Sequence, residues 1–316
     1  MGGRDHPEKS TGKKAQAERT PRYHVGRARV VERLSPTMMR VVVEGLRGFP
    51  TRGAVGETVR VVLPDPETGR VPEPDLTGGK PRWAKPAPLT RKYTVRRVEP
   101  ERGTVEIAVV AHGRGPGSRW AQGLTPGDPV HLLGPKSGRE TPEPGRFLLM
   151  VGDETGLPGI ARWLEQLPAD AVGRVILEVP GAGSVQDLTA PAGVRLTWLV
   201  PDGRQSGARD GLDGEGGRRG GVLSAPADPA GDARAGEGGS AGSPGSAGGG
   251  EPGAAEVLAG SDVLEVVQRM PVPEGPVFAW LAGESTVLRP VRRFLMERWG
   301  LDKRSMHAKG YWNRRD

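Results

Sequence analysis

Cysteine is absent from the 316 residues of this chain. Its absence excludes disulfide frameworks, zinc sites built on thiolates and iron–sulfur clusters held by cysteine. Any redox chemistry must therefore come from a bound organic cofactor or from a metal that the substrate brings. The few histidines are scattered along the chain, and we expect no metal site in the protein itself.

Long apolar runs are also missing. The core-like runs are short, such as residues 147–151, whereas a membrane-spanning helix needs about 20 apolar residues. Residues 1–20 are charged and lack the apolar segment of a signal peptide. We therefore expect a soluble, cytoplasmic protein without a membrane span.

Length and composition indicate more than one folded unit. A typical domain has roughly 150 residues, so this chain is long enough for two. Lysine and arginine number 45 against 38 aspartates and glutamates, which gives a net charge of +7 and suits an anionic ligand without identifying it. Glycine and proline make up about a quarter of the residues, so low-complexity segments are expected.

The first part of the chain predicts a barrel. Residues 1–20 offer nothing apolar to bury, and we expect a disordered tail there. Residues 21–140 contain six short, valine-rich runs separated by turn residues, which are typical of a small antiparallel barrel. The expected strands are 23–34, 38–44, 57–63, 92–98, 105–111 and 130–133. The proline-rich loop 64–88 is long for a compact domain, so we expect it to be functional or mobile. Covering a binding site is one function that such a loop could have.

Residues 141–316 predict an α/β fold, because strands alternate with helices and so form parallel βαβ units in a doubly wound sheet. The expected strands are 147–151, 174–179, 195–200, 277–282 and 305–309, and the expected helices are 156–167, 262–270 and 284–299. The glycine-rich residues 203–256 interrupt this pattern and predict a disordered insertion. A longer flexible loop costs little to close, so an inert surface insertion is favoured over a binding element.

Four segments could carry chemistry, and the first is Arg91-Lys92-Tyr93-Thr94. Arg91 and Tyr93 share one face of a strand. A flavin needs such a pair, because a guanidinium binds its phosphates and an aromatic ring packs on its isoalloxazine, while Thr94 can hydrogen-bond the ring. The alternative is an exposed strand with alternating charges.

The second segment is the glycine-rich run from His112 to Trp120, which opens a helical stretch. Backbone amides at a helix N-terminus, together with the Ser118 hydroxyl, suit a pyrophosphate. A Gly-Pro turn with a serine cap would look similar. His112 is not expected to act as an acid or base.

The third and fourth segments are strand-to-helix turns. Residues 151–158 lie where doubly wound folds bind nucleotides, although a G-x-G-x-x-G fingerprint is absent. A capped helix with Pro158 in its first turn is the alternative. In the other turn, residues 280–285, Glu284 could hydrogen-bond a bound ring or simply favour the helix dipole.

In this order, the segments resemble the siderophore-interacting protein family, which comprises FAD-dependent ferric-siderophore reductases of the ferredoxin-reductase superfamily. The resemblance extends over about residues 23–314 apart from the insertion. It is carried by RKYTVRR (91–97), HGRGPGSRWA (112–121), GDETGLPGIARWLE (152–165), WLAGES (280–285) and KGYW (309–312). Gly156 and Gly159 stand where the family usually has alanine, and Arg60 stands at what looks like a family lysine position.

The resemblance implies a six-stranded antiparallel Greek-key β-barrel that binds FAD (residues 21–140), followed by a doubly wound parallel α/β domain that binds NAD(P)H (residues 141–316). It assigns the flavin to Arg91, Tyr93, Thr94, His112, Gly117 and Ser118. It assigns NAD(P)H to Asp153, Glu154, Thr155, Gly283 and Glu284. Trp312 is a candidate to cap the flavin or chelate pocket, with a terminal strand packed on the sheet as the alternative.

The implied reaction is hydride transfer from NAD(P)H to FAD, followed by single-electron reduction of Fe(III) in an anionic siderophore chelate. A flavin connects the two because nicotinamide gives two electrons and Fe(III) accepts one. Fe(II) binds hard oxygen ligands less well, so the iron can leave. We expect Arg60, Arg119 and Lys309 to steer the chelate, and no residue is assigned as a catalytic acid or base.

Other interpretations remain at this stage. The acceptor could be a quinone or free flavin. A basic glycine-rich nucleic-acid-binding module is a further alternative, but residues 203–256 contain no aromatic residue for base stacking, so we expect no nucleic-acid partner. We expect a monomer. The choice between NADH and NADPH stays open, since residues 180–183 offer no arginine for a 2′-phosphate but Arg195 or Arg204 could reach it.

Overall fold

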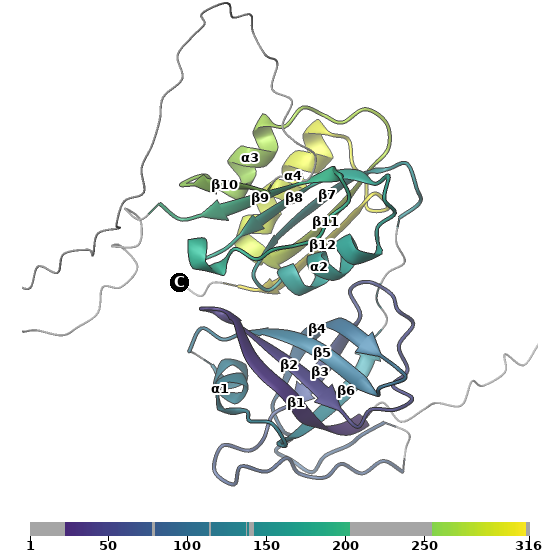
Figure 1. Ribbon diagram of the computed structural model, residues 1–316, viewed down its shortest axis with the longest axis vertical. Coiled ribbons are helices and arrows are strands. Elements are labelled where there is room, and N and C mark those ends of the chain that lie inside the picture. Colours follow the sequence, from purple (N-terminus) through teal and green to yellow (C-terminus); the bar gives the residue numbers. More distant parts are fainter. Residues whose placement is uncertain are drawn as a thin grey trace, which may run out of the picture.

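The computed structural model describes residues 23–77, 80–113, 115–136, 138, 142–202 and 255–313 (Figure 1). A β-barrel occupies the lower half of Figure 1, and a parallel sheet with its helices occupies the upper half. The tail expected at residues 1–20 and all but the last two residues of the insertion expected at 203–256 lie outside the described residues.

The barrel has the expected Greek-key architecture. Six antiparallel strands close in the order β1-β2-β5-β4-β3-β6. The strands are β1 (Tyr23–Ser35), β2 (Met38–Glu44), β3 (Thr58–Val62), β4 (Thr90–Glu99), β5 (Thr104–Val110) and β6 (Pro129–Lys136). Side chains alternate across each strand, and the interior is filled by residues such as Val41, Val43, Ile107 and Leu132.

The helix α1 (Pro116–Gly123) lies between β5 and β6 in the chain. It packs against the barrel. Gly115 precedes it with a φ of 78°, a conformation that glycine adopts without a steric penalty. Pro116 then begins the helix, where its missing N–H costs nothing. Ala121 and Leu124 join the barrel core, so the helix is fixed to the barrel by apolar contacts.

The proline-rich loop 64–88 lies against the barrel through Trp83. The Trp83 ring stands edge-on to Tyr23 with centroids 5.9 Å apart, and its Nε1 donates to the Pro72 carbonyl at 2.7 Å. The described residues of this loop do not line the large cavity presented below, so its expected role as a cover has no support there.

The second region is a six-stranded parallel sheet in the order β10-β9-β8-β7-β11-β12, as expected for a doubly wound fold. Its strands are β7 (Phe147–Asp153), β8 (Val172–Glu178), β9 (Gly193–Val200), β10 (Ala255–Ala259), β11 (Val277–Glu284) and β12 (Met306–Trp312). Its helices are α2 (Leu157–Gln166), α3 (Val263–Arg269), α4 (Ser285–Arg298) and the short 3-10 helix η1 (Ala182–Ser184).

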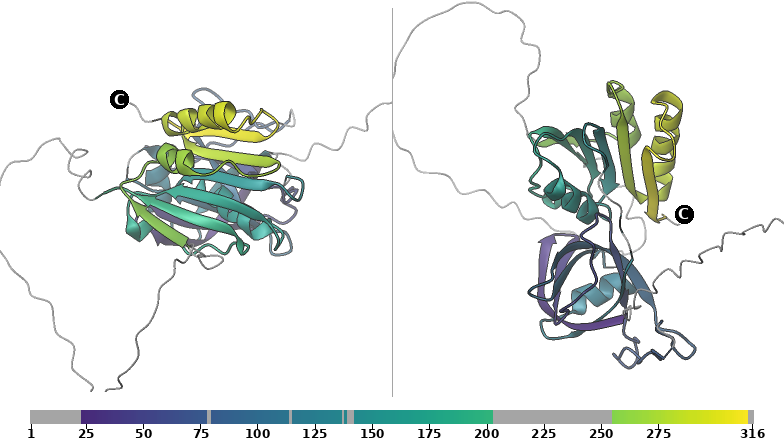
Figure 2. Two further views of the ribbon diagram at one scale, coloured as in Figure 1. Left: turned by 90° about the horizontal axis from the view of Figure 1, so that it is seen from above. Right: turned by 90° about the vertical axis from the view of Figure 1, so that its right-hand side faces the viewer.

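Helices cover both faces of this sheet, because alternate residues of each strand point to opposite sides. Leu148 and Met150 of β7 pack with Trp163 of α2, whereas Leu149 and Val151 pack with the residues of α3 and α4. Figure 1 shows α2 on the side nearest the barrel, and Figure 2 shows the sheet region stacked on the barrel when the molecule is viewed from the side.

Strand β10 was not predicted, and the expected insertion overlaps it at Ala255 and Glu256. This strand pairs in parallel with β9 at the sheet edge and is largely exposed. An exposed edge strand of mixed polarity lacks the continuous apolar run by which buried parallel strands are identified. For this reason the sequence pattern did not predict β10.

The hydrophobic interior continues from the sheet region into the barrel. Met38 and Ala108, which belong to β2 and β5, are buried in the same cluster as α2 and the sheet. No helix in the described parts of the chain is both long and apolar enough to cross a membrane.

Candidate functional site

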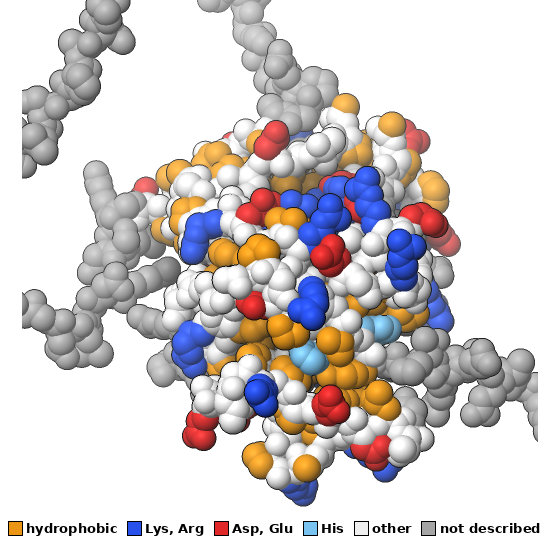
Figure 3. Space-filling view, turned by 60° about the horizontal axis from the view of Figure 1, so that its bottom comes forward, with side chains coloured by type: hydrophobic (Ala, Val, Ile, Leu, Met, Phe, Trp, Pro, Cys, Tyr) orange, Lys and Arg blue, Asp and Glu red, His pale blue; other side chains and the backbone are white. Residues whose placement is uncertain are grey.

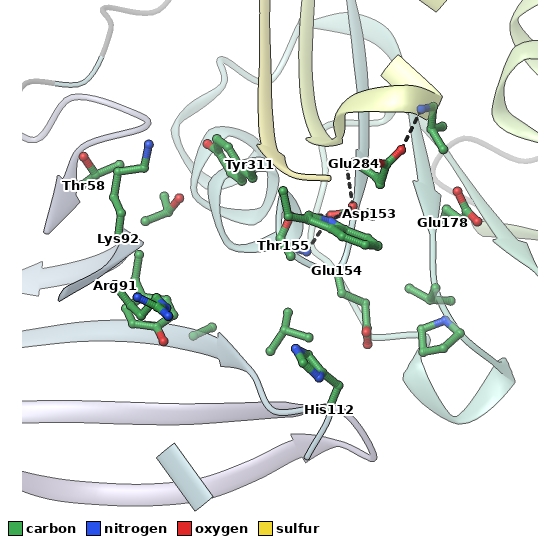
Figure 4. A pocket seen from close by; sticks show the side chains of 18 of the residues that line it. Thr58, Arg91, Lys92, His112, Asp153, Glu154, Thr155, Glu178, Glu284 and Tyr311 are labelled. Atoms are coloured by element: carbon green, nitrogen blue, oxygen red, sulfur yellow. Dashed lines mark hydrogen bonds between the residues drawn. The ribbon is translucent and has the colours of Figure 1, made fainter. Parts of the chain in front are cut away.

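A cavity of about 650 Å³ lies between the barrel and the carboxyl edge of the sheet (Figure 4). The strand order brings β7 and β11 together as neighbours although α2, β8, β9, β10 and α3 separate them in the chain. Such a switch point is where doubly wound sheets bind ligands. The barrel lines the cavity with Thr58, Arg91, Lys92, Tyr93, Thr94, Ala108, Val110 and His112. The sheet region lines it with Asp153, Glu154, Thr155, Glu178, Val179, Pro180, Pro201, Glu284, Val287, Tyr311 and Trp312.

One face of β4 packs on α1. A Cβ added to Gly117 would lie 2.4 Å from the Tyr93 hydroxyl oxygen and 3.0 Å from the Arg91 Cγ. The prediction that Arg91 and Tyr93 share a face is therefore confirmed, and Gly117 makes room for both. Burial raises the pKa of Tyr93 to about 12, with Arg91 opposing the shift, so its hydroxyl stays protonated at neutral pH.

The other face of β4 meets β12. The Lys92 Nζ lies 5.7 Å from the centroid of the Tyr311 ring, and Thr94, on the same face, is buried. Burial raises the pKa of Tyr311. Both faces of β4 thus contribute to the site.

Lys92 and Tyr311 were missed as site residues. Lys92 lies on the same face of β4 as Thr94, so the alternation of side chains along the strand was the available signal for it. Tyr311 lies at the carboxyl end of a parallel strand, and that position was the available signal, since such ends gather at the binding edge of a sheet.

The loop after β5 brings His112 to the cavity and leads into α1. The buried Ser118 hydroxyl oxygen accepts a hydrogen bond from the Gly113 backbone N–H at 2.9 Å. Ser118 therefore holds the loop closed over the first turn of α1, and its contact with a pyrophosphate stays a prediction.

Asp153 ties together the ends of three strands. Its Oδ1 accepts hydrogen bonds from the Thr155 N–H at 2.8 Å and the Thr155 hydroxyl at 2.6 Å. Its Oδ2 accepts from the Glu284 N–H at 2.8 Å and from the Trp312 Nε1 at 2.7 Å. A Cβ at Gly283 would lie 2.8 Å from that Oδ2, so glycine is required for this close approach.

Glu284 caps α4. Its Oε2 accepts from the backbone N–H groups of Thr286 at 2.7 Å and Val287 at 2.9 Å, and the residue is only 4% exposed. A carboxylate at this helix N-terminus agrees with the alternative that Glu284 favours the helix dipole, and Glu284 also caps the helix. Because Glu284 also lines the cavity, a contact with a bound ring stays a prediction.

Glu154 bridges the two regions. It accepts a hydrogen bond from the hydroxyl of Thr37, which precedes β2, and that hydroxyl lies 3.2 Å from the Ser184 hydroxyl. Burial raises the pKa of Glu154, and the hydrogen bonds from Thr37 and Ser184 oppose this. Figure 4 shows Glu154 reaching from the sheet side toward His112.

A cluster of cations gathers at Lys92. Arg60 is opposite Lys92 in the pairing of β3 with β4, and Lys309 of β12 and Lys136 of β6 also act on it. Burial, and then these neighbouring cations, lower the pKa of Lys92 to about 8. We call Arg60, Lys92, Lys136 and Lys309 the cation cluster.

Two of the three predicted substrate residues, Arg60 and Lys309, thus belong to the cation cluster, of which Lys92 alone lines the cavity. The third, Arg119, is exposed on α1 and does not line the cavity. Within the described ranges, no group of three or more histidine, aspartate or glutamate side chains could hold a metal ion.

The barrel wall fits a flavin. Arg91 offers a guanidinium, Tyr93 an aromatic ring and Thr94 a hydroxyl along one strand, beside the N-terminus of α1. The close packing of Tyr93 and Arg91 over Gly117 positions this wall without a ligand. A volume of about 650 Å³ lies within the range of roughly 300–1,000 Å³ that small-molecule and cofactor sites occupy.

A Greek-key barrel followed by a doubly wound sheet is the ferredoxin-reductase-like fold. Residues 27–139 match the siderophore-interacting FAD-binding domain. Residues 146–214 and 251–315 match the family described as siderophore-interacting protein. The chain belongs to the siderophore-interacting protein family, as the sequence motifs indicated.

Similar proteins of known structure or curated name agree with this family. A siderophore utilization protein from T. fusca is 29% identical, with a TM-score of 0.68 over 92% of this chain and 93% of that one. The ferric vibriobactin reductase of Vibrio cholerae is 27% identical over 286 residues, covering 89% of this chain and 86% of that protein. The NADPH-dependent ferric-chelate reductase of Escherichia coli is 32% identical over 185 residues, covering 57% and 72%.

Proposed function

We propose that this flavin-dependent oxidoreductase reduces ferric siderophores with electrons from NAD(P)H, residues 21–140 holding FAD and residues 141–316 holding NAD(P)H. The observation that carries the proposal is the shared cavity. The strand bearing Arg91, Tyr93 and Thr94 faces the same space as the carboxyl ends of β7 and β11. The ferric-reductase names of two relatives support the choice of acceptor.

On the barrel wall, Arg91 would bind the FAD phosphates, Tyr93 would pack on the isoalloxazine and Thr94 would hydrogen-bond its edge. The amides around Gly117 and Ser118 would receive the pyrophosphate, and His112 lies beside them. Bound FAD supplies a carrier that accepts two electrons from a nicotinamide and releases them singly to Fe(III).

On the sheet wall, the turn of Asp153, Glu154 and Thr155 and the end of β11 would hold NAD(P)H. Asp153 and Gly283 fix the shape of this edge through the contacts described above. Trp312, which donates to Asp153, would close the cavity at the end of β12.

The choice of dinucleotide follows from Glu178. This residue ends β8 and lines the cavity. In doubly wound folds an acidic side chain near this position binds the ribose 2′-hydroxyl and disfavours a 2′-phosphate. We therefore expect NADH to be preferred, in contrast to the NADPH dependence named for the E. coli relative.

The substrate is the Fe(III) chelate, and its ligands come from the siderophore. The cation cluster would attract the anionic chelate to the Lys92 end of the cavity. Fe(II) has less affinity for hard oxygen donors than Fe(III), so reduction loosens the chelate and releases the iron.

An anaerobic absorption experiment tests this proposal. The purified protein is titrated with FAD, then with NADH or NADPH, and then with a ferric catecholate siderophore. The expected result is flavin absorption that bleaches with the nicotinamide and returns on addition of the chelate. Protein that takes up no flavin, or a reduced flavin that the chelate does not reoxidise, would contradict it.

The electron acceptor distinguishes this proposal from the alternative of a flavin-dependent oxidoreductase that reduces a quinone or free flavin. Turnover with quinones or free flavin in place of ferric siderophores separates these alternatives directly, because the donor half of the reaction is shared. A nucleic-acid-binding role gains no support from the face seen in Figure 3, where lysine and arginine side chains are interspersed with aspartate and glutamate.

A further inference from the structure

A buried ion pair joins the barrel to the sheet region. Arg162 of α2 and Glu57, which directly precedes β3, are 4% and 1% exposed. The Arg162 Nη2 lies 3.1 Å from the Glu57 Oε2. A buried charge pair is costly to desolvate, so by itself it is weak evidence for a contribution to stability. We therefore looked for a role of this pair other than stabilisation.

Both partners are held by further hydrogen bonds. The Glu57 carboxylate accepts from the Thr51 hydroxyl at 2.7 Å and from the Arg52 backbone N–H at 2.8 Å. The Arg162 Nη1 donates to the Val95 carbonyl at 3.0 Å, and the Val95 N–H donates to the Glu57 carbonyl at 2.8 Å. The guanidinium is therefore fixed in direction as well as in position.

These contacts lie next to the cavity on both sides. Glu57 precedes Thr58 and Val95 follows Thr94, and both Thr58 and Thr94 line the cavity. At Val95 the pairing of β4 with β5 shifts register. The hydrogen bonds between these two strands therefore do not by themselves fix the position of β4 at this residue. Arg162 belongs to the helix that begins just after the Asp153–Thr155 turn. The ion pair thus connects the flavin wall to the nicotinamide wall.

We propose that Arg162 is a positioning residue that sets the angle between the two walls, and so the approach of the nicotinamide to the flavin. This rests on the proposed function. A displacement of about 1 Å between reacting groups can reduce a rate about 100-fold. The pair of Arg96 and Glu165 joins β4 to α2 as well, but it is partly open to solvent, and it serves as a comparison.

The first measurement needs no cofactor. The chain has no cysteine, so Val25→Cys in β1 and Val172→Cys in β8, both exposed, accept one spin label each. In the apoprotein, the distance distribution between the labels is expected to broaden in Arg162→Met and to stay narrow in Arg96→Met. A distribution in Arg162→Met as narrow as that of the wild type overturns the proposal.

The second measurement separates positioning from stability. In Arg162→Met the rate of flavin reduction in a stopped-flow mixture with NADH is expected to fall about 100-fold. In Arg96→Met it should stay within about twofold, because the Arg96–Glu165 pair is partly open to solvent and contributes less than a buried pair. Glu57→Gln combined with Arg162→Met removes both buried charges, and should recover the melting temperature but not the rate.

Recovery of the rate together with the melting temperature in the double variant would show a merely structural role and overturn the proposal. The proposed function fails in a different way, through a wild type that binds no FAD or is not reduced by either nicotinamide. The spin-label distances report on Arg162 in either case.

Discussion

The two walls of the cavity use their polar side chains in different ways. On the barrel wall, Arg91 and Lys92 are exposed cations that line the cavity. On the sheet wall, the Asp153 carboxylate accepts from backbone N–H groups of its own turn and of the end of β11. The Glu284 carboxylate accepts from those of α4. The barrel wall presents charge to a ligand, whereas the sheet wall uses charge to shape the backbone that receives one. Substitutions on the two walls should therefore affect different quantities.

The largest effect is expected for Asp153→Ala. The N–H groups of Thr155 and Glu284 and the Trp312 Nε1 would all lose their charged acceptor. Hydrogen bonds to charged groups contribute about 1.5–3 kcal/mol each, so the free energy of unfolding of the apoprotein should fall by about 3 kcal/mol or more. Urea denaturation measures this, and an unchanged midpoint would show that the sheet wall does not depend on Asp153.

Arg91→Ala should show the opposite behaviour. Loss of a guanidinium that pairs with phosphate removes a charge-assisted hydrogen bond, and the dissociation constant for FAD should rise about 10- to 100-fold. The urea midpoint should not move. Fluorescence titration with FAD reports the affinity, and a variant that loses stability instead of affinity would break the distinction between the walls.

A smaller effect is expected for Glu178→Gln. The wild type should have a higher kcat/KM with NADH than with NADPH, because the Glu178 carboxylate repels a 2′-phosphate. Removing the charge should reduce this preference about tenfold, which corresponds to about 1.4 kcal/mol. The dissociation constants of NAD⁺ and NADP⁺ provide a check that is independent of turnover. Preference for NADPH in the wild type would assign the 2′-phosphate to other residues.

The smallest effect concerns pH. Lys92 carries its charge below its pKa of about 8 and loses it above, so attraction of an anionic chelate weakens as the pH rises through that value. KM for the ferric siderophore should increase a few-fold between pH 7 and pH 9. In Lys92→Met, KM should already be high at pH 7 and change less over this interval. Equal pH profiles would place the titrating group elsewhere.

Periodicity predicted most of the fold. Short valine-rich runs separated by turn residues marked every barrel strand, and Val41 and Val43 of one such run lie in the barrel interior. The exposed edge strand β10 escaped because no continuous apolar run marks it. Local pattern identifies an element when burial is one-sided or complete, and fails where an element is held mainly by its neighbours.

The candidate site could be predicted only in part. Motifs identified Arg91, Tyr93 and the two strand-end turns, because the neighbouring residues in the sequence determine the position of each. The ion pair of Glu57 and Arg162 had no such signal, since its partners are far apart in the chain and meet only when α2 packs on the barrel. The clustering of Lys92 with Lys309 has the same origin, a contact between β4 and β12.

Met38 and Ala108 belong to barrel strands but are buried with the sheet region. Cutting the chain near residue 140 would expose these side chains to water on one fragment and leave a matching apolar hollow on the other. The molecule thus has two architectural parts, but we expect neither part to fold without the other. We expect a single calorimetric transition for the whole chain, with the two halves melting as one cooperative unit.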